Sequence, residues 1–167
     1  LQKGEKPFRN ACSSCAPVSV SITVRLPNGS TENTSPQVIS HDCSLALGGT
    51  QILMQGGHHP KLTKQWYLEL LSHIKAKFPQ VNIHGFSPSE FVAFQEFFNE
   101  PVEQIIRDFV KAGLGSIPGG GGEILVDRVR HRIAPLKAMS DEWLGVMDVA
   151  HRLGLASTAT MMFGHVE

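Results

Sequence analysis

The sequence has few cysteines, no excess of charge and no long apolar run. Its 167 residues include three cysteines. This number is small, and because it is odd the cysteines cannot all pair, so it does not suit a disulfide scaffold and indicates a reducing compartment. Fifteen Lys and Arg residues balance fifteen Asp and Glu residues, so the charge predicts no nucleic-acid partner and no anionic membrane partner. No apolar run approaches the roughly 18 residues that a membrane helix needs, and no signal peptide opens the chain. These absences predict a cytoplasmic protein without a membrane segment.

What is present is the composition of a folded, globular chain, with 41% apolar and 18% charged residues. The length suits about one domain. The chain begins at Leu1 rather than at a methionine and stops at Glu167 after an apolar run. These ends predict a piece of a longer protein.

The composition changes near residue 45. Residues 13–40 are rich in Ser, Thr, Pro, Asn and Gly, whereas the later chain alternates between short apolar runs and amphipathic stretches. The alternating residues 18–24 and the turn sequence Asn28-Gly29 are compatible with a hairpin. The second arm has no apolar residue to bury, so we favour a weakly specified loop. We therefore divide the chain into an N-terminal segment, 1–44, and a folded region, 45–167.

The folded region repeats with a period of about thirty residues, which is the length of one βα unit. We predict strands at 51–55, 81–86, 116–118 and 158–163, with helices between them. Right-handed crossovers make such a series either an open doubly wound sheet or a barrel. The barrel is favoured, because no Gly-x-Gly-x-x-Gly turn follows the first strand. The prediction is an α/β fold with part of a barrel, since four units do not close one.

Polar residues gather at the expected carboxyl ends of these strands, where barrel enzymes carry their active sites. They are His58, His59, His84, Glu123 and His165. One interpretation is a metal-dependent barrel hydrolase, in which His and carboxylate ligands bind a divalent ion that activates water. The chain has neither a His-x-His strand pair nor a helical His-Glu-x-x-His motif, which counts against it. The alternatives are a cofactor site and a non-catalytic barrel remnant.

Two glycine-rich loops also follow predicted strands. Gly56 and Gly57 end the first strand, and four consecutive glycines, 119–122, precede Glu123. Glycine leaves backbone N–H and C=O groups open to close approach by a ligand. A small polar molecule bound across both loops would be held largely by main chain, with one carboxylate to accept from its hydroxyl or ammonium groups.

Four stretches of the chain resemble one enzyme family: 46–57, 83–88, 115–130 and 159–167. They are similar to the radical S-adenosyl-L-methionine (SAM) enzymes of the futalosine menaquinone pathway, among them aminofutalosine synthase, and to the related deazaflavin synthase subunit. The run Pro-Gly-Gly-Gly-Gly-Glu-Ile-Leu-Val-Asp-Arg-Val-Arg is most similar to the dehypoxanthine futalosine cyclases. The resemblance covers residues 45–167 and implies a truncated, partial (βα)6 TIM-like radical SAM barrel.

The resemblance also implies a chemistry. It implies a 4Fe-4S iron-sulfur cluster, SAM, an external electron donor and a small nucleoside-derived substrate. The implied reaction is the radical cyclisation of dehypoxanthine futalosine to cyclic dehypoxanthine futalosine. Such chemistry belongs to the cofactor, while the protein supplies positioning and excludes water.

By position, the resemblance assigns roles to individual residues. Glu123 matches an acidic residue near SAM, and Thr160 is expected on a strand beneath SAM. The expected SAM-binding set is Gly56, Gly57, Ser87, Glu123 and Thr160. The candidates for orienting substrate or transferring a proton are His58, His84 and His165.

The chain departs from the family pattern at its front. The superfamily requires Cys-x3-Cys-x2-Cys, whereas this chain offers Cys12 and Cys15 and then no cysteine until Cys43. Two thiolates are fewer than an ordinary cluster needs. We interpret 1–44 as a divergent or out-of-frame segment that replaces the cluster loop, because codons for 18–24 exist that encode Phe-Cys-Glu-Tyr-His-Arg in another frame. The chain as written is therefore expected to be inactive.

Overall fold

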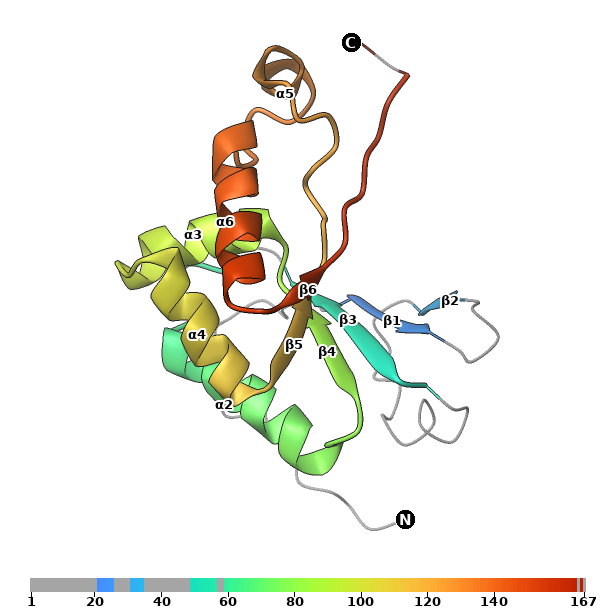
Figure 1. Ribbon diagram of the computed structural model, residues 1–167, viewed down its shortest axis with the longest axis vertical. Coiled ribbons are helices and arrows are strands. Elements are labelled where there is room, and N and C mark those ends of the chain that lie inside the picture. The colour runs from blue at the N-terminus through green and yellow to red at the C-terminus, as the bar shows by residue number, and fades with distance from the viewer. Residues whose placement is uncertain (1–20, 26–30, 35–48, 57–58, 165, 167) are drawn as a thin grey trace.

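A six-stranded sheet forms the centre of the molecule. The computed structural model describes residues 21–25, 31–34, 49–56, 59–164 and 166 (Figure 1). The strand order is β2-β1-β3-β4-β5-β6, and the last four strands are parallel to one another. The strands are β1 (Ser21–Arg25), β2 (Thr31–Thr34), β3 (Gln51–Gln55), β4 (Asn82–Gly85), β5 (Leu114–Ile117) and β6 (Ala156–Ser157). The α/β prediction is confirmed.

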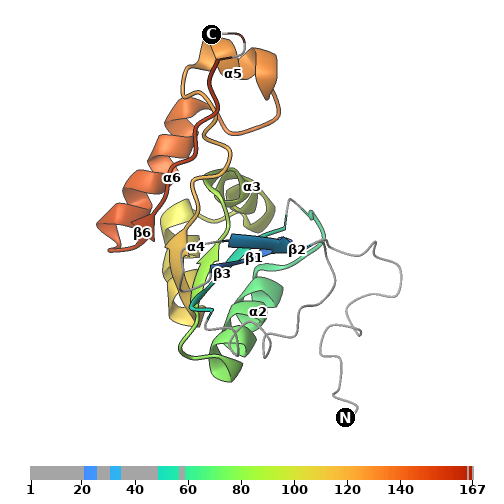
Figure 2. The same cartoon turned by 90° about the vertical axis from the view of Figure 1, so that its right-hand side faces the viewer.

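Helices connect the parallel strands. They are α2 (Lys64–Lys77), α3 (Pro88–Phe98), α4 (Val102–Ala112), α5 (Asp127–Ile133) and α6 (Ser140–Arg152). The pairs α2 and α4, α3 and α4, and α3 and α6 contact one another, as Figures 1 and 2 show. Sequential parallel strands joined by right-handed crossovers keep their helices on one face of the sheet. No helix in the described part of the chain is long and apolar enough to cross a bilayer.

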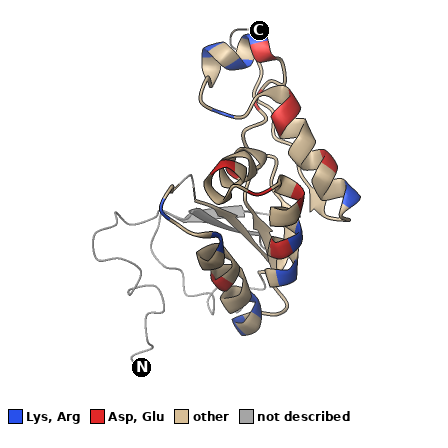
Figure 3. Ribbon diagram, turned by 90° about the vertical axis from the view of Figure 1, so that its left-hand side faces the viewer, with Lys and Arg blue, Asp and Glu red and all other residues tan. Residues whose placement is uncertain are grey.

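The core lies between the strands and this helix layer. Ile52 and Met54 of β3 are buried, while the alternate β3 residues are half-buried, as expected when only one face is covered by helices. Tyr67 of α2 packs against Phe94 and Phe109, with ring centroids 4.7 and 6.1 Å away. Charges of both signs are mixed along the outer surfaces of the helices (Figure 3). Lys64 pairs with Glu100 and with Asp108, which ties α2 to α4.

Several local sequence signals are confirmed. Ser87 precedes α3, Pro88 is its first residue, and the Glu90 carboxylate accepts from the Ser87 N–H at 2.7 Å, which is the capping arrangement that the sequence Ser-Pro-Ser-Glu favours. Pro101 is the N-cap of α4, and Gly113 ends that helix at φ +116°, a conformation that favours glycine.

The N-terminal loop prediction was wrong, because β1 and β2 form an antiparallel pair. Strand β1 pairs antiparallel with β2, from Ile22 opposite Thr34 to Arg25 opposite Thr31, and antiparallel with β3 on its other side. Without β1, the N–H and C=O groups on one edge of β3 would have no strand partner. Main-chain pairing satisfies these groups without requiring apolar residues on the second arm.

Two further elements differ from the prediction. The last strand is Ala156–Ser157 instead of 158–163, and it pairs with Ser116 and Ile117 of β5. The residues after it turn to the glycine loop, since the Thr160 N–H and Oγ1 both donate to the Gly119 carbonyl. Helix α5 was not predicted, because its seven residues are too few to show a helical period.

Candidate cofactor site at the strand ends

The carboxyl ends of the parallel strands meet at one edge of the sheet. Ser87 follows β4, and the loop 119–123 follows β5. A methyl group added to Gly120 would lie 2.6 Å from Gln55 Nε2 and 3.6 Å from Ser87 Cβ. The Thr160 Oγ1 donates to the Gly119 carbonyl at 2.8 Å. The ends of four strands therefore lie within contact distance of one loop.

Glu90 holds two of these strand ends together. Its side chain is buried, with 4% exposed. One carboxylate oxygen accepts from the Gly56 N–H at 3.0 Å, and the other accepts from the Ser87 N–H at 2.7 Å and Oγ–H at 2.9 Å. Its position in the first turn of α3 also suits its charge. Burial, together with the nearby Glu90 carboxylate, raises the pKa of Tyr67 to about 12.

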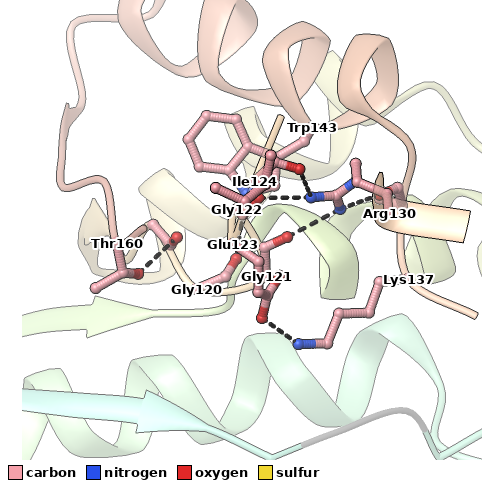
Figure 4. A network of polar contacts seen from close by, with 11 residues as sticks. Gly120, Gly121, Gly122, Glu123, Ile124, Arg130, Lys137, Trp143 and Thr160 are labelled. Atoms are coloured by element: carbon pink, nitrogen blue, oxygen red, sulfur yellow. Dashed lines mark hydrogen bonds and ion pairs between the residues drawn. The ribbon is translucent and has the colours of Figure 1, made fainter. Parts of the chain in front are cut away.

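Side chains hold all four carbonyls of the glycine loop, as Figure 4 shows. Thr160 donates to Gly119, and the Trp143 indole Nε1–H donates to the Gly120 carbonyl at 3.2 Å. The Arg130 guanidinium donates to the Gly121 carbonyl at 2.9 Å and the Gly122 carbonyl at 2.5 Å. The loop is therefore fixed in shape although it consists of glycine.

Several polar groups around this loop have no partner among the described residues. They include the N–H groups of Gly120, Gly121 and Glu123, the buried Oγ of Ser89, and the buried Oε2 of Glu123. A methyl group added to Gly121 would lie 2.6 Å from the Ser89 Oγ, so that hydroxyl borders the loop. Buried polar groups in proteins are nearly always hydrogen-bonded, so such a cluster indicates a place for a polar ligand.

The backbone at this edge is also unusual. Among the described non-glycine residues, three have positive φ, and two of them lie here: Phe86 at 61° and Glu123 at 31°. Phe86 directly precedes Ser87, and Glu123 directly follows the glycines. Non-glycine residues in this conformation cost free energy and gather at ligand sites. The other oxygen of the Glu123 carboxylate pairs with Lys137.

His84 lies in a row of polar side chains on the sheet face that the helices leave uncovered. Its Nδ1 lies 2.7 Å from Ser116 Oγ, and its Nε2 lies 3.4 Å from Thr158 Oγ1. The Asn82 amide continues the row, donating to Ser116 and to Gln51 at 2.9 Å each. Burial of the ring lowers the pKa of His84, which favours the neutral imidazole.

The structure brings together part of the predicted site. Gly56, Ser87, Glu123 and Thr160 lie at the same edge of the sheet, although Thr160 follows β6 and is not on a strand. His84 is the third of four residues in β4, and not at its end. His59 instead accepts locally from the Lys61 N–H, at 3.3 Å. Outside the described residues lie Gly57, His58, His165, Cys12 and Cys15.

Three residues of the site were not predicted from the sequence. The sequence Ser-Pro-Ser-Glu favours Glu90 as a cap of its own helix, but Glu90 also accepts from Gly56, 34 positions away. Arg130 and Trp143 had no assigned role, and each reaches the glycine loop from a helix that follows it. The order of these residues in the chain gives no sign of such contacts, which depend on how α5 and α6 pack.

A surface groove of about 430 Å³ lies elsewhere, between α3, α4 and α6. Its lining includes Glu96, Glu142, Asp148 and Arg152 on the outer side of the helix layer. None of the polar groups around the glycine loop lines this groove. It is therefore separate from the strand ends.

Comparison with known proteins agrees with the motifs. Cyclic dehypoxanthine futalosine synthase of Streptomyces coelicolor is 45% identical over 121 residues, 72% of this chain and 30% of that protein. The 5-amino-6-(D-ribitylamino)uracil--L-tyrosine 4-hydroxyphenyl transferase of Methanopyrus kandleri is 41% identical over 120 residues, again 72% of this chain and 32% of that protein. Aminodeoxyfutalosine synthase of Thermus thermophilus is 38% identical over 120 residues. The chain is a homologue of these enzymes.

As a homologue of the futalosine synthases, the chain spans about a third of the length of the relatives that it matches. The resemblance inferred from the four sequence stretches is thereby confirmed. No family model matches the chain.

The metal-hydrolase interpretation gains no support from the described part of this futalosine synthase homologue. The described residues contain no group of three or more His, Cys, Asp or Glu side chains that could hold a metal ion. His84, the one described member of the catalytic His set, contacts hydroxyl groups instead.

Proposed function

We propose that this chain is part of a radical SAM enzyme that cyclises dehypoxanthine futalosine. On this proposal the four parallel strands are four of the six strands of a truncated, partial (βα)6 barrel, and the glycine loop forms its SAM site. Homology to the cyclic dehypoxanthine futalosine synthases supports the family. The proposed SAM site rests on one observation, the cluster of unpartnered polar groups at the strand ends.

The described residues fit SAM. A SAM molecule carries a carboxylate, an ammonium and ribose hydroxyls, which need both donors and acceptors. The N–H groups of Gly120 and Gly121 can donate to its oxygens, and Glu123 Oε2 can accept from its ammonium or hydroxyl groups. Together with a reduced iron-sulfur cluster, SAM supplies radical chemistry that removes a hydrogen atom from the substrate.

The chain's own residues bind and orient. Glu90 keeps the strand ends at 56 and 87 in register, and the side chains behind the glycine loop fix its donors. His84, held neutral by burial, can accept a proton at Nε2, the ring atom with the longer contact. The row of polar side chains that includes His84, Ser116 and Asn82 lies on the sheet face away from the helices, and a hydroxyl-rich, nucleoside-derived substrate would contact that face.

The cysteines do not fit a 4Fe-4S cluster. Cys12 and Cys15 have the spacing of only two of the three required ligands, and both lie outside the described residues. We therefore propose that residues 1–44 replace the cluster loop and that the chain as written has no SAM-cleaving activity. A cytoplasmic location and an external electron donor belong to the same proposal.

Calorimetric titration of the chain with SAM tests the site. We expect measurable binding that Glu123→Gln weakens roughly ten- to a hundredfold, because a hydrogen bond to a charged group is worth about 1.5 to 3 kcal/mol. Glu96→Gln, an exposed carboxylate on α3, is the matched control and should bind like the wild type. Equal affinity of the Glu123 and Glu96 variants would remove Glu123 from the site.

Anaerobic reconstitution tests the activity. We expect far fewer than the about four irons per chain of a complete cluster, because too few thiolates converge. A reconstituted chain with about four irons and the broad cluster absorbance would contradict the proposed inactivity.

A further inference from the structure

Arg130 is a fully buried cation held only by carbonyl groups. Its exposed fraction is 0%, and it makes no ion pair with a described carboxylate. Its Nη2 and Nη1 donate to the Gly121 and Gly122 carbonyls, and its Nε donates to the Ala138 carbonyl at 3.0 Å. Burying a charge without a counter-charge is costly, so a side chain placed in this way must do something for the loop that it binds.

Peptide geometry shows what these contacts do. The C=O of one residue and the N–H of the next belong to the same trans peptide plane and point in opposite directions. Trp143 binds the Gly120 carbonyl, so the Gly121 N–H points away from the indole. Arg130 binds the Gly122 carbonyl, so the Glu123 N–H points away from the guanidinium. Neither N–H has a partner among the described residues.

We propose that Arg130 and Trp143 are positioning residues that turn the Gly121 and Glu123 N–H groups toward a bound ligand. Both contacts lie on one side of the loop, on the side of α5 and α6 (Figure 4). The unpartnered Ser89 Oγ borders the loop at Gly121, where an added methyl group would lie 2.6 Å from it. The ligand group that these donors recognise is an acceptor oxygen, a carboxylate or hydroxyl. This inference rests on the proposed function in taking SAM as the ligand.

The test compares Arg130→Lys and Trp143→Phe with Arg132→Lys, a matched control on the exposed side of α5. Lysine retains the charge but lacks the planar fork that reaches several carbonyls at once. Phenylalanine retains the aromatic packing but donates no hydrogen bond. For each variant we would record the backbone amide resonances of Gly121 and Glu123, the unfolding midpoint in urea, and SAM affinity by calorimetry.

We expect both site variants to shift the two amide resonances and to weaken SAM binding roughly tenfold, whereas the Arg132 variant changes neither. If the two side chains had a purely structural role, the variants would lower the unfolding midpoint but leave the amide resonances and the SAM affinity unchanged. That result would overturn the proposal. If Arg130→Lys fails to fold, Trp143→Phe decides by the same readouts. If the wild type does not bind SAM, the proposed function fails, while the amide resonances still decide the positioning.

Discussion

Two buried side chains of opposite charge, Glu90 and Arg130, bind main chain at the same edge of the sheet. Glu90 accepts from the N–H groups of the two strand ends, and Arg130 donates to the carbonyls of the glycine loop. A substitution does not remove a backbone N–H or C=O group unless it introduces proline. At this edge the side chains that bind the backbone therefore decide where its donors and acceptors lie. The site therefore depends on the residues behind the loop as well as on the glycines of the loop itself.

Replacing Glu90 with Ala should lower the free energy of unfolding by about 2 to 4 kcal/mol. The buried N–H groups of Gly56 and Ser87 would lose their acceptor, and each unsatisfied group is costly. Urea denaturation measures the change. Glu96→Ala on the exposed side of the same helix should stay within about 0.5 kcal/mol of the wild type. If Glu90→Ala lowered the free energy of unfolding no more than the control does, the contacts of Glu90 with Gly56 and Ser87 would not contribute to stability.

His84 should make stability fall as pH falls. Burial lowers its pKa in the folded state below the value of about 6.5 in the unfolded chain, so below that pH the unfolded chain binds a proton that the folded chain does not. The contribution is fully present above pH 6.5 and is lost as pH falls toward the folded-state pKa. Urea midpoints between pH 7.5 and pH 5 should change less for His84→Asn than for the wild type. His131→Asn, at an exposed position, is the control.

The residue-scale features divide clearly into predictable and unpredictable ones. The capping role of Glu90 follows from Ser-Pro-x-Glu, because both partners lie within one helical turn. Its contact with Gly56 does not follow, because it depends on β3 and β4 being neighbours. In the same way, Glu123 was predicted from its glycine neighbours, whereas Arg130 and Trp143 needed the packing of the later helices.

At the scale of elements, the glycine loop and the segment after β6 pack so closely that side chains are excluded between them. A methyl group on Gly119 would lie 2.2 Å from the Thr158 carbonyl oxygen. Sequence patterns indicated the strand ends and the loop, but they placed the last strand at 158–163. The apolar run there resembles a strand, while the hydrogen bonds of Thr158 and Thr160 to residues 117 and 119 carry the chain along the loop instead.

Gly119→Ala should destabilise the fold by about 1 to 3 kcal/mol, because the added methyl group overlaps backbone that cannot move independently. Gly145→Ala is the matched control. Gly145 lies within α6 with nothing within 4 Å of an added methyl group, so alanine there should stabilise the helix by about 0.5 to 1 kcal/mol. Thermal unfolding of the two variants would measure this contrast. Equal midpoints would show that the close approach at Gly119 does not exist in solution.

At the scale of the whole molecule, the chain corresponds to one part of its longer relatives. It matches about a third of each relative, and the polar face of its sheet is not covered by its helices. The parallel α/β arrangement was predictable from the thirty-residue repeat. The antiparallel hairpin beside β3 was only partly predictable. The alternating residues 18–24 and the turn sequence Asn28-Gly29 are compatible with it, but its pairing with β3 depends on an edge of the sheet that local sequence does not reveal.

A hybrid tests the function at this scale. Residues 45–167 would replace the matching segment of the Streptomyces coelicolor cyclic dehypoxanthine futalosine synthase, which retains its own cysteines. We expect the hybrid to cyclise dehypoxanthine futalosine, and Glu123→Gln within it to reduce the rate roughly tenfold. A hybrid that is folded and binds its cluster but forms only the aminodeoxyfutalosine or tyrosine-transfer product would assign the segment to one of the other relatives.

The hydrogen bonds from side chains to the glycine loop also set an order in which parts of the chain can fold during synthesis. The Glu90 contacts involve only residues up to 90, so they can form while the later chain is still being made. The four glycines have been synthesised by residue 122, yet their carbonyls are held by residues 130, 143 and 160. Until those residues emerge from the ribosome, no side chain holds the carbonyls of the glycine loop. If the loop binds SAM as proposed, a nascent chain is expected to gain that affinity only after residues 130, 143 and 160 have all reached the loop.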